Sequence, residues 1–354
     1  MNKKLLIMAT AALFAACASN DVKNDIEESL NEIDFNAATY KTTRAEITSN
    51  ANLATENGFV VWGYKAKYQA SMNWATDAYT VFNGINVYVK SGEDGAYIEG
   101  TGTDWTYADK KYWDKNASYC FYAVAPYNPT NGTYSISDAN VANNEKKITI
   151  TGATSGLASN SDDFLIARGG VKNRRGNTTD NVNFVFNHTM AKVDFLLKKG
   201  SNVNGVVKVQ KITMSGWDNG AGTFAQTSET TPGNISHTEW TIPSYATTAG
   251  QGTIDVLTTE SAELTTTGAA TTTLPCIMVP QTISQGLLTF TINFTIGDEQ
   301  FLAHEGSLTT QQVWGTDSHI TYTLTIDPAA IEFDVQSIAG FTNVPDPNGA
   351  AIIQ

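Results

Sequence analysis

The stretch LLTFTINFTI, residues 287–296, decides the fold class of this chain. Apolar side chains occupy every second position, and threonine or asparagine occupies most of the positions between them. Successive side chains of a β-strand point to opposite faces, so this alternation predicts a strand with one face in a core. HITYTLTI, residues 319–326, repeats the pattern. The side chains expected in the core are Leu288, Phe290, Ile292, Phe294 and Ile296 in the first stretch and Ile320, Tyr322, Leu324 and Ile326 in the second.

Shorter runs of the same kind recur along the chain, separated by Gly, Asn and Pro. Two of them are INVYV (85–89) and KITIT (147–151). Many short strands between turn residues predict an all-β protein made of antiparallel β-sandwiches. The run VNFVFNHTMAKVDFLL (182–197) changes phase, because the apolar positions have opposite parity in its two halves. This change predicts a bulge or tight bend at residues 188–190.

The stretch RGGVKNRRGNTTDN, residues 168–181, is rich in Gly, Asn and basic side chains. We interpret it as a linker between two domains or as a long exposed loop. The expected domains are an N-terminal β-sandwich at residues 45–175 and a C-terminal β-sandwich at residues 180–354. With 354 residues, the chain is long enough to give each domain its own core. A cut after Arg174 or Arg175 would then separate the two domains.

Residues 1–16, MNKKLLIMATAALFAA, have the features of an export signal: two lysines, then an apolar run that ends in small residues. The run is too short to span a bilayer as a stable helix, so we expect a signal peptide rather than an anchor helix. Cys17 follows directly, an arrangement similar to a bacterial lipobox, in which the cysteine is acylated. We therefore expect lipidation at Cys17, which would hold the precursor in the outer membrane. The alternative is ordinary signal cleavage after Ala18.

Residues 17–44 are expected to form an acidic spacer and a removable N-terminal strand. Asp and Glu dominate the first part, and EIDFNAATY then places Ile33 and Phe35 at alternating positions. Arg44, the first of only four arginines, stands among small residues ahead of the first strongly apolar segment. An exposed linker of small residues is accessible to a protease. We expect proteolytic processing between Arg44 and Ala45, with Lys41 as a nearby competing site.

Composition and motifs argue against several functional classes. The formal net charge of −13 is opposite to the basic face that nucleic acids require. The four histidines show no metal-ligand spacing, and no nucleophile elbow, phosphate loop or dinucleotide fingerprint is present. We therefore expect no catalytic residue, no cofactor and no metal. The carboxylate pairs at 93–94 and 162–163 are interpreted as solvated, and His188 as a hydrogen-bonded structural residue.

Aromatic and cysteine side chains have two readings each. The stretch DWTYADKKYW, residues 104–113, could stack on sugars if exposed, but the aromatic side chains are expected to fill cores. Cys120 and Cys276 lie in separate apolar runs, SYCFYAVAP and LPCIMVP. An exported protein can form disulfides, but two buried thiols are expected here.

Six motifs in a fixed order resemble the fimbrillin family of Bacteroides-type bacteria, the type V pilins with their tip and anchor relatives. They extend over nearly the whole mature chain and follow a lipoprotein-like signal. The motifs are NGFVVWGY (57–64), YWDKNASYCFYAVAPYN (112–128), SDDFLIA (161–167), VNFVFNHTMAKVDF (182–195), CIMVPQT (276–282) and HITYTLTIDPAAIEFDV (319–335).

This resemblance implies two transthyretin-like β-sandwiches in tandem, exported as a lipoprotein. It also implies that a trypsin-like, arginine-specific protease removes an N-terminal segment at the cell surface. A strand from another subunit then fills the groove that the departing strand leaves. The chain departs from the family pattern at Phe341, where a tryptophan is usual, and in the tail VPDPNGAAIIQ (344–354).

The leading hypothesis is therefore a structural subunit of a cell-surface fimbria that supports adhesion and is not an enzyme. Its expected partners are other fimbrial subunits, alike or different, the arginine-specific processing protease, and the outer membrane through acylated Cys17 before processing. The stalk, tip or anchor role and the receptor stay open. A glycan-binding outer-membrane surface lipoprotein is the alternative, and a glycosidase with two carboxylates across a cleft is the third reading.

Overall fold

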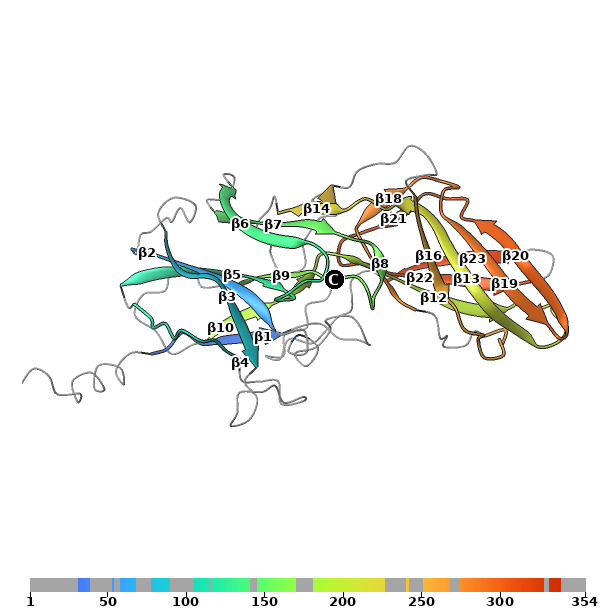
Figure 1. Ribbon diagram of the computed structural model, residues 1–354, viewed down its shortest axis with the longest axis horizontal. Helices are drawn as coiled ribbons and strands as arrows, with labels where there is room; N and C mark the ends of the chain where they lie inside the picture. Colours follow the sequence, from blue (N-terminus) through green and yellow to red (C-terminus); the bar gives the residue numbers. More distant parts are fainter. Residues whose placement is uncertain are drawn as a thin grey trace, which may run out of the picture.

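In the computed structural model of this chain, the β-strands form an elongated molecule (Figure 1). The all-β prediction is confirmed by the strands found along the chain. The structure describes residues 31–38, 53, 58–67, 78–89, 105–114, 116–140, 145–169, 181–226, 240–241, 251–267, 274–327 and 331–338. We call the part up to residue 188 the N-terminal half and the part from residue 191 the C-terminal half.

A six-stranded antiparallel sheet forms the centre of the N-terminal half, with the strand order β11-β9-β5-β2-β3-β4. Every residue of the central strand β5 is buried, because other strands cover both faces of the sheet. The strands are β2 (Phe59–Lys67), β3 (Tyr79–Val89), β4 (Trp105–Thr106), β5 (Ala117–Ala125), β9 (Leu165–Gly169) and β11 (Asn187–His188).

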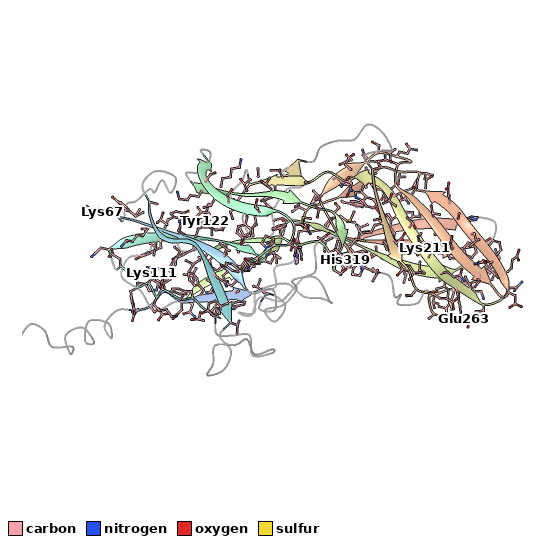
Figure 2. The ribbon with its side chains drawn as sticks, viewed as in Figure 1. Lys67, Lys111, Tyr122, Lys211, Glu263 and His319 are labelled. Atoms are coloured by element: carbon pink, nitrogen blue, oxygen red, sulfur yellow. The ribbon has the colours of Figure 1, made fainter. Side chains whose placement is uncertain are left out.

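Two smaller sheets cover the faces of this sheet and give the N-terminal half three layers (Figure 1). On one face, β1 (Phe35–Ala38) and β10 (Val182–Val185) form a parallel pair. On the other face, the strand order is β15-β14-β7-β6. The side chain of Tyr122, labelled in Figure 2, belongs to the core under this second sheet. The strands of the second sheet are β6 (Thr133–Asn140), β7 (Glu145–Ala153), β14 (Gly222–Ala225) and β15 (Trp240–Thr241).

The C-terminal half is a sandwich of two sheets, with strand orders β23-β22-β12-β17-β8 and β16-β13-β19-β20. Phe195, Phe290 and Tyr322 meet in its core with ring centroids 5.6–5.9 Å apart. A further pair, β18 (Gln281–Ile283) and β21 (Gln312–Trp314), lies beside it. The strands of the two sheets are β8 (Gly156–Leu157), β12 (Ala191–Lys199), β13 (Val207–Asp218), β16 (Gln251–Leu257), β17 (Cys276–Met278), β19 (Thr289–Ile296), β20 (Glu299–Ser307), β22 (His319–Ile326) and β23 (Ile331–Ile338).

The predicted strands at 287–296 and 319–326 are confirmed as β19 and β22. Their expected core residues are buried, apart from Ile296, which is partly buried at the edge of the same core. The run at 182–197 breaks at the predicted place, between the end of β11 and the start of β12. Its phase changes because the chain leaves the N-terminal core there and enters the C-terminal core, so the side chains face a different sheet.

Strand pairs connect the two halves, because each half contributes a strand to a sheet of the other. β14 follows β13 in the sequence but pairs with β7 of the N-terminal half, and β8 pairs with β17 of the C-terminal half. Phe224, Ile277 and Val279 therefore share one core cluster with Trp62 and Tyr122. Residues 182–188 form β10 and β11, which pair with β1 and β9 within the N-terminal half, whereas the expected C-terminal domain begins at 180. The division into two domains stays a prediction.

Candidate functional site: the N-terminal strand and its groove

The strand predicted ahead of Arg44 is present as β1, at the lower face of the N-terminal half (Figure 1). It pairs in parallel with β10, and the register joins Phe35 to Val182 and Ala37 to Phe184. These two strands form a sheet of their own among the described residues. β1 is therefore a short strand at the edge of the fold, far in sequence from the strand that holds it.

The inward side chains of this segment complete the core of the N-terminal half. Ile33, Phe35 and Ala37 alternate along the chain, and their exposed fractions are 0%, 2% and 7%. The ring of Phe35 lies among four aromatic rings, with centroid distances of 5.4–5.8 Å. These rings belong to Phe82, Tyr107, Phe121 and Phe184. Burial of a side chain of this size stabilises a fold by about 1.5–3 kcal/mol, so β1 is an integral part of this core.

A second element, residues 105–113, holds the chain just before β1; we call it the strap. The backbone N–H of Ile33 donates to the carbonyl of Lys111 at 2.9 Å, and the N–H of Trp113 donates to the carbonyl of Asn31 at 3.0 Å. The hydroxyl of Tyr107 donates to the carbonyl of Ile33 at 2.8 Å. On the opposite side, the N–H of Val182 donates to the carbonyl of Asp34 at 2.7 Å. The segment 31–38 therefore lies in a groove with two walls, the strap and β10.

The strap also explains the aromatic stretch DWTYADKKYW. Trp105, Tyr107 and Trp113 are buried, so the expectation that these rings fill a core is confirmed for them, while Tyr112 is exposed. Lys111, labelled in Figure 2, lies on the strap in the lower part of the N-terminal half, where β1 also lies. The sequence signal for the strap was present in this stretch, but nothing local indicated that its backbone pairs with residues 31–33.

Charged side chains lie beside the segment 31–38. Lys110 forms an ion pair with Glu32, donates to Thr106 Oγ1 at 3.1 Å, and stands 4.6 Å from the ring centre of Tyr107. Partial desolvation, together with the nearby Glu32 carboxylate, raises the pKa of Asp34 above its ordinary value. Burial also raises the pKa of Tyr107 well above its ordinary value, so this hydroxyl remains a hydrogen-bond donor at any physiological pH.

Loss of β1 would open this groove. β10 would lose its partner in the described sheet, and the rings around Phe35 would face water. Unpaired backbone groups beside an apolar groove form a template for strand addition by another chain. Without β1, the groove would therefore bind an extended peptide segment.

The predicted modification sites lie outside the described residues. This is true of Cys17, Arg44 and Ala45, and of the expected signal peptide at residues 1–16. Lipidation and processing therefore stay predictions. Sequence reasoning found the strand, but it missed both walls of the groove.

The other candidate groups are structural. His188 Nδ1 lies 2.8 Å from Asp163 Oδ2, and both side chains are 1% exposed. The burial of His188 against Asp163 agrees with a structural role for His188. The interpretation of 162–163 as a solvated pair is wrong for Asp163, since the fold buries it against His188. Asp162 accepts the backbone N–H of Thr130 at 3.0 Å and holds a turn.

A second His–Asp pair lies near the middle of the molecule, at His319 in Figure 2. His319 Nε2 is 2.7 Å from Asp194 Oδ2, and Thr321 Oγ1 donates to Asp194 Oδ1 at 2.8 Å. Burial opposes ionisation of Asp194, but the hydrogen bonds from His319 and Thr321 outweigh it and lower the pKa of this carboxyl. Nowhere in the described part of the chain do three His, Cys, Asp or Glu side chains gather in a way that could hold a metal ion.

The two internal cysteines are buried and are not bridged to each other, as predicted. Burial raises the pKa of Cys276 to about 12, so its thiol stays protonated and unreactive at neutral pH. None of the residues that the structure describes forms a helix of the length and hydropathy that a membrane crossing requires.

Comparison with known proteins gives one family. The model of the fimbrillin-like family matches residues 43–340. Among solved structures, the chain is similar to a fimbrial protein from Bacteroides vulgatus, at 16% identity and a TM-score of 0.55, over 88% of this chain and 100% of that one. This likeness shows a shared fold. No curated protein matches the chain.

Two further solved structures are similar at lower scores. One is a fimbrial assembly protein from Parabacteroides distasonis, at 12% identity and a TM-score of 0.36, over 87% of this chain and 98% of that one. The other is the tip fimbrial protein Mfa3 from Porphyromonas gingivalis with a C-terminal truncation, at 10% identity and a TM-score of 0.34, over 87% and 99%.

Proposed function

Because this chain belongs to the fimbrillin-like family, we propose that it is a structural subunit of a cell-surface fimbria that supports adhesion. The family is one of fimbrial structural proteins and not of enzymes, which agrees with the expectation of no catalysis. The subunit is exported as an outer-membrane lipoprotein precursor through Cys17, cut between Arg44 and Ala45, and joined to other fimbrial subunits by strand exchange.

The observation that carries this proposal is the position of β1. It is a four-residue strand at the edge of the fold, its inward side chains belong to the core, and Arg44 follows it by six residues, counting from Ala38 to Arg44. A cut after Arg44 severs the covalent link between β1 and the rest of the fold without dividing any of the other described strands. Only the noncovalent contacts of the groove then retain the segment.

Strand exchange is supported by the energetics of those contacts. A replacement strand regains backbone hydrogen bonds worth about 1 kcal/mol each and buries apolar side chains worth about 1.5–3 kcal/mol each. The excised segment makes the same contacts, but it is a short peptide that is diluted after release. A strand carried by a neighbouring subunit is kept near by the rest of the assembly, and its effective concentration favours it.

Processing is tested with an arginine-specific protease and the full-length chain. We expect the first cut after Arg44, giving a product that begins Ala45-Glu46-Ile47, followed by polymer formation. Arg44→Ala should stay uncut at this position and stay monomeric, while the matched control Lys41→Ala should be cut and polymerise like wild type. Polymers that form equally well from uncut Arg44→Ala would contradict the mechanism.

Lipidation is tested by metabolic labelling with a fatty acid. Wild type should carry the label, and Cys17→Ala should lose it and accumulate as precursor. Cys276→Ala is the control, since a buried internal thiol should not affect labelling. Label that persists in Cys17→Ala would contradict acylation at this residue.

The glycan-binding alternative would need a cluster of exposed aromatic side chains. Within the described residues, the exposed aromatic side chains are Tyr79 and Tyr112, on β3 and on the strap. Selective binding on a glycan array, together with polymers from uncut protein, would favour this alternative over the fimbrial subunit.

A further inference from the structure

The two walls of the groove run in opposite directions relative to the segment 31–38. β1 runs parallel to β10, with Phe35 to Ala38 in register with Val182 to Val185. The strap runs antiparallel to the preceding residues, with Glu32 opposite Tyr112. Parallel and antiparallel pairs place their donors and acceptors differently, so a strand inserted in reverse would lose both patterns. The backbone of the groove therefore distinguishes the direction of its occupant.

Side-chain size varies along the groove in a fixed order. Phe35 occupies the space among four rings and is paired with Val182, a smaller side chain. Two residues on, Ala37 is paired with Phe184, whose ring already stacks on Phe35 at 5.8 Å. A large side chain at position 37 would compete with the ring of Phe184 for space. The groove is therefore complementary to an aromatic residue followed, two positions later, by a small one.

On the outer side of β1, hydrogen bonds of the Asn36 side chain depend on the strand register. The Asn36 amide donates to Asn183 Oδ1 at 3.1 Å and accepts from Asn181 Nδ2 at 3.2 Å. A slip by one residue would remove both contacts and turn the aromatic side chain toward solvent, because side chains alternate between faces.

We propose that this groove selects the incoming strand of another subunit, accepting a strand that runs in the direction of β1 and carries an aromatic residue with a small residue two positions later. Tyr107 acts as a positioning residue. Its hydroxyl donates a hydrogen bond to the carbonyl of residue 33, and its ring lines the aromatic pocket. This inference rests on the proposed strand exchange and adds the identity of the partner segment to it.

The test uses full-length chain cut by the arginine-specific protease, and fluorescent ten-residue peptides with the sequence of residues 30–39, LNEIDFNAAT. Capture of the native peptide is compared with capture of the Phe35→Ala and Ala37→Phe peptides and of a peptide with the same residues in reverse order. We expect Phe35→Ala to weaken capture about a hundredfold or more. The Ala37→Phe and reversed peptides should not be captured. Equal capture of the native and reversed peptides, or of the native and Phe35→Ala peptides, would overturn the inference and leave strand exchange intact.

The role of Tyr107 is tested in parallel on intact, uncut chain by hydrogen exchange. Tyr107→Phe keeps the ring and removes the hydroxyl, so exchange should accelerate about five- to tenfold in residues 31–38 and stay unchanged in β22. Tyr134→Phe is the matched control, because its hydroxyl donates to the carbonyl of Tyr127, away from the groove. A cut chain that captures no peptide would refute strand exchange at this groove. The hydrogen exchange then decides the positioning role by itself, and unchanged exchange in 31–38 would overturn it.

Discussion

Replacing Phe35 by alanine in the full-length chain tests whether β1 is a separable part of the core. Phe35 is 2% exposed and lies among four aromatic rings at 5.4–5.8 Å. Truncation of a buried phenylalanine to alanine costs about 3–5 kcal/mol. At about 1.4 kcal/mol per tenfold change, the equilibrium constant for opening of β1 should rise by roughly two to three and a half orders of magnitude.

The region of the chain in which this stability is lost distinguishes local opening from global unfolding. β1 pairs with β10 at the edge of the fold, and the strap holds only the residues before it. We therefore expect the cost to appear as local opening of the segment 31–38, while the sheets of the C-terminal half keep their protection. The core of the C-terminal half is a separate cluster of side chains, so it does not depend on Phe35.

Hydrogen exchange followed by mass spectrometry measures both parts in one experiment. Peptides that cover 31–38 should exchange at least about a hundredfold faster in Phe35→Ala than in wild type, and peptides that cover β22 should not change. Tyr79→Ala is the control, because this side chain is 73% exposed and should affect neither region. Equal acceleration in β22 would show that β1 unfolds only with the whole chain. No acceleration in 31–38 would show that Phe35 does not anchor the strand. Either result would refute the reasoning.

Three further predictions concern charge, burial and the connection of the halves. Partial desolvation raises the pKa of Asp34, so docking of β1 should gain stability as the pH falls through that raised value, with the gain complete below the ordinary value of 3.8. Asp34→Asn should raise the hydrogen-exchange protection of β1 at pH 7 and remove this pH dependence. Unchanged protection would contradict this prediction. His188→Leu leaves the buried carboxyl group of Asp163 without its imidazole partner and should lower the free energy of unfolding by about 1–3 kcal/mol in a denaturant titration. Unchanged stability would contradict the pairing. A cut after Arg174 or Arg175 should leave the two halves together on gel filtration, because β7 pairs with β14 and β8 with β17 across them; separate elution would refute this and restore the expectation that such a cut separates the domains.

Local patterns were sufficient to predict several of the strands. The alternation in HITYTLTI corresponds to β22 at residues 319–326, and the alternation of Ile33 with Phe35 corresponds to the buried positions around β1. Both predictions rest on the fact that a strand with one face in a core must place apolar side chains at every second position. The same rule located the break in the run at 182–197, although it could not tell a bulge from a change of sheet.

The partners of each strand could not be predicted in this way. Phe35 is 147 positions before its register partner Val182, counting 182 minus 35, and no local pattern in either segment specifies the other. The strap shows the same limit, because DWTYADKKYW was recognised as rich in core aromatics while its backbone bonds to residues 31–33 were not. The crossing of β14 to β7 is a third case.

Side-chain periodicity is a property of a few consecutive residues, and it records only whether each side chain faces a core or water. The alternating runs of this chain therefore predicted its all-β class, and the ordered motifs indicated the family. Pairing between strands depends on which distant backbone edges and side-chain shapes fit together once the chain is compact. The groove around β1, built from residues near 35, 107 and 182, exists only through that long-range fit, so it became visible only in the folded molecule.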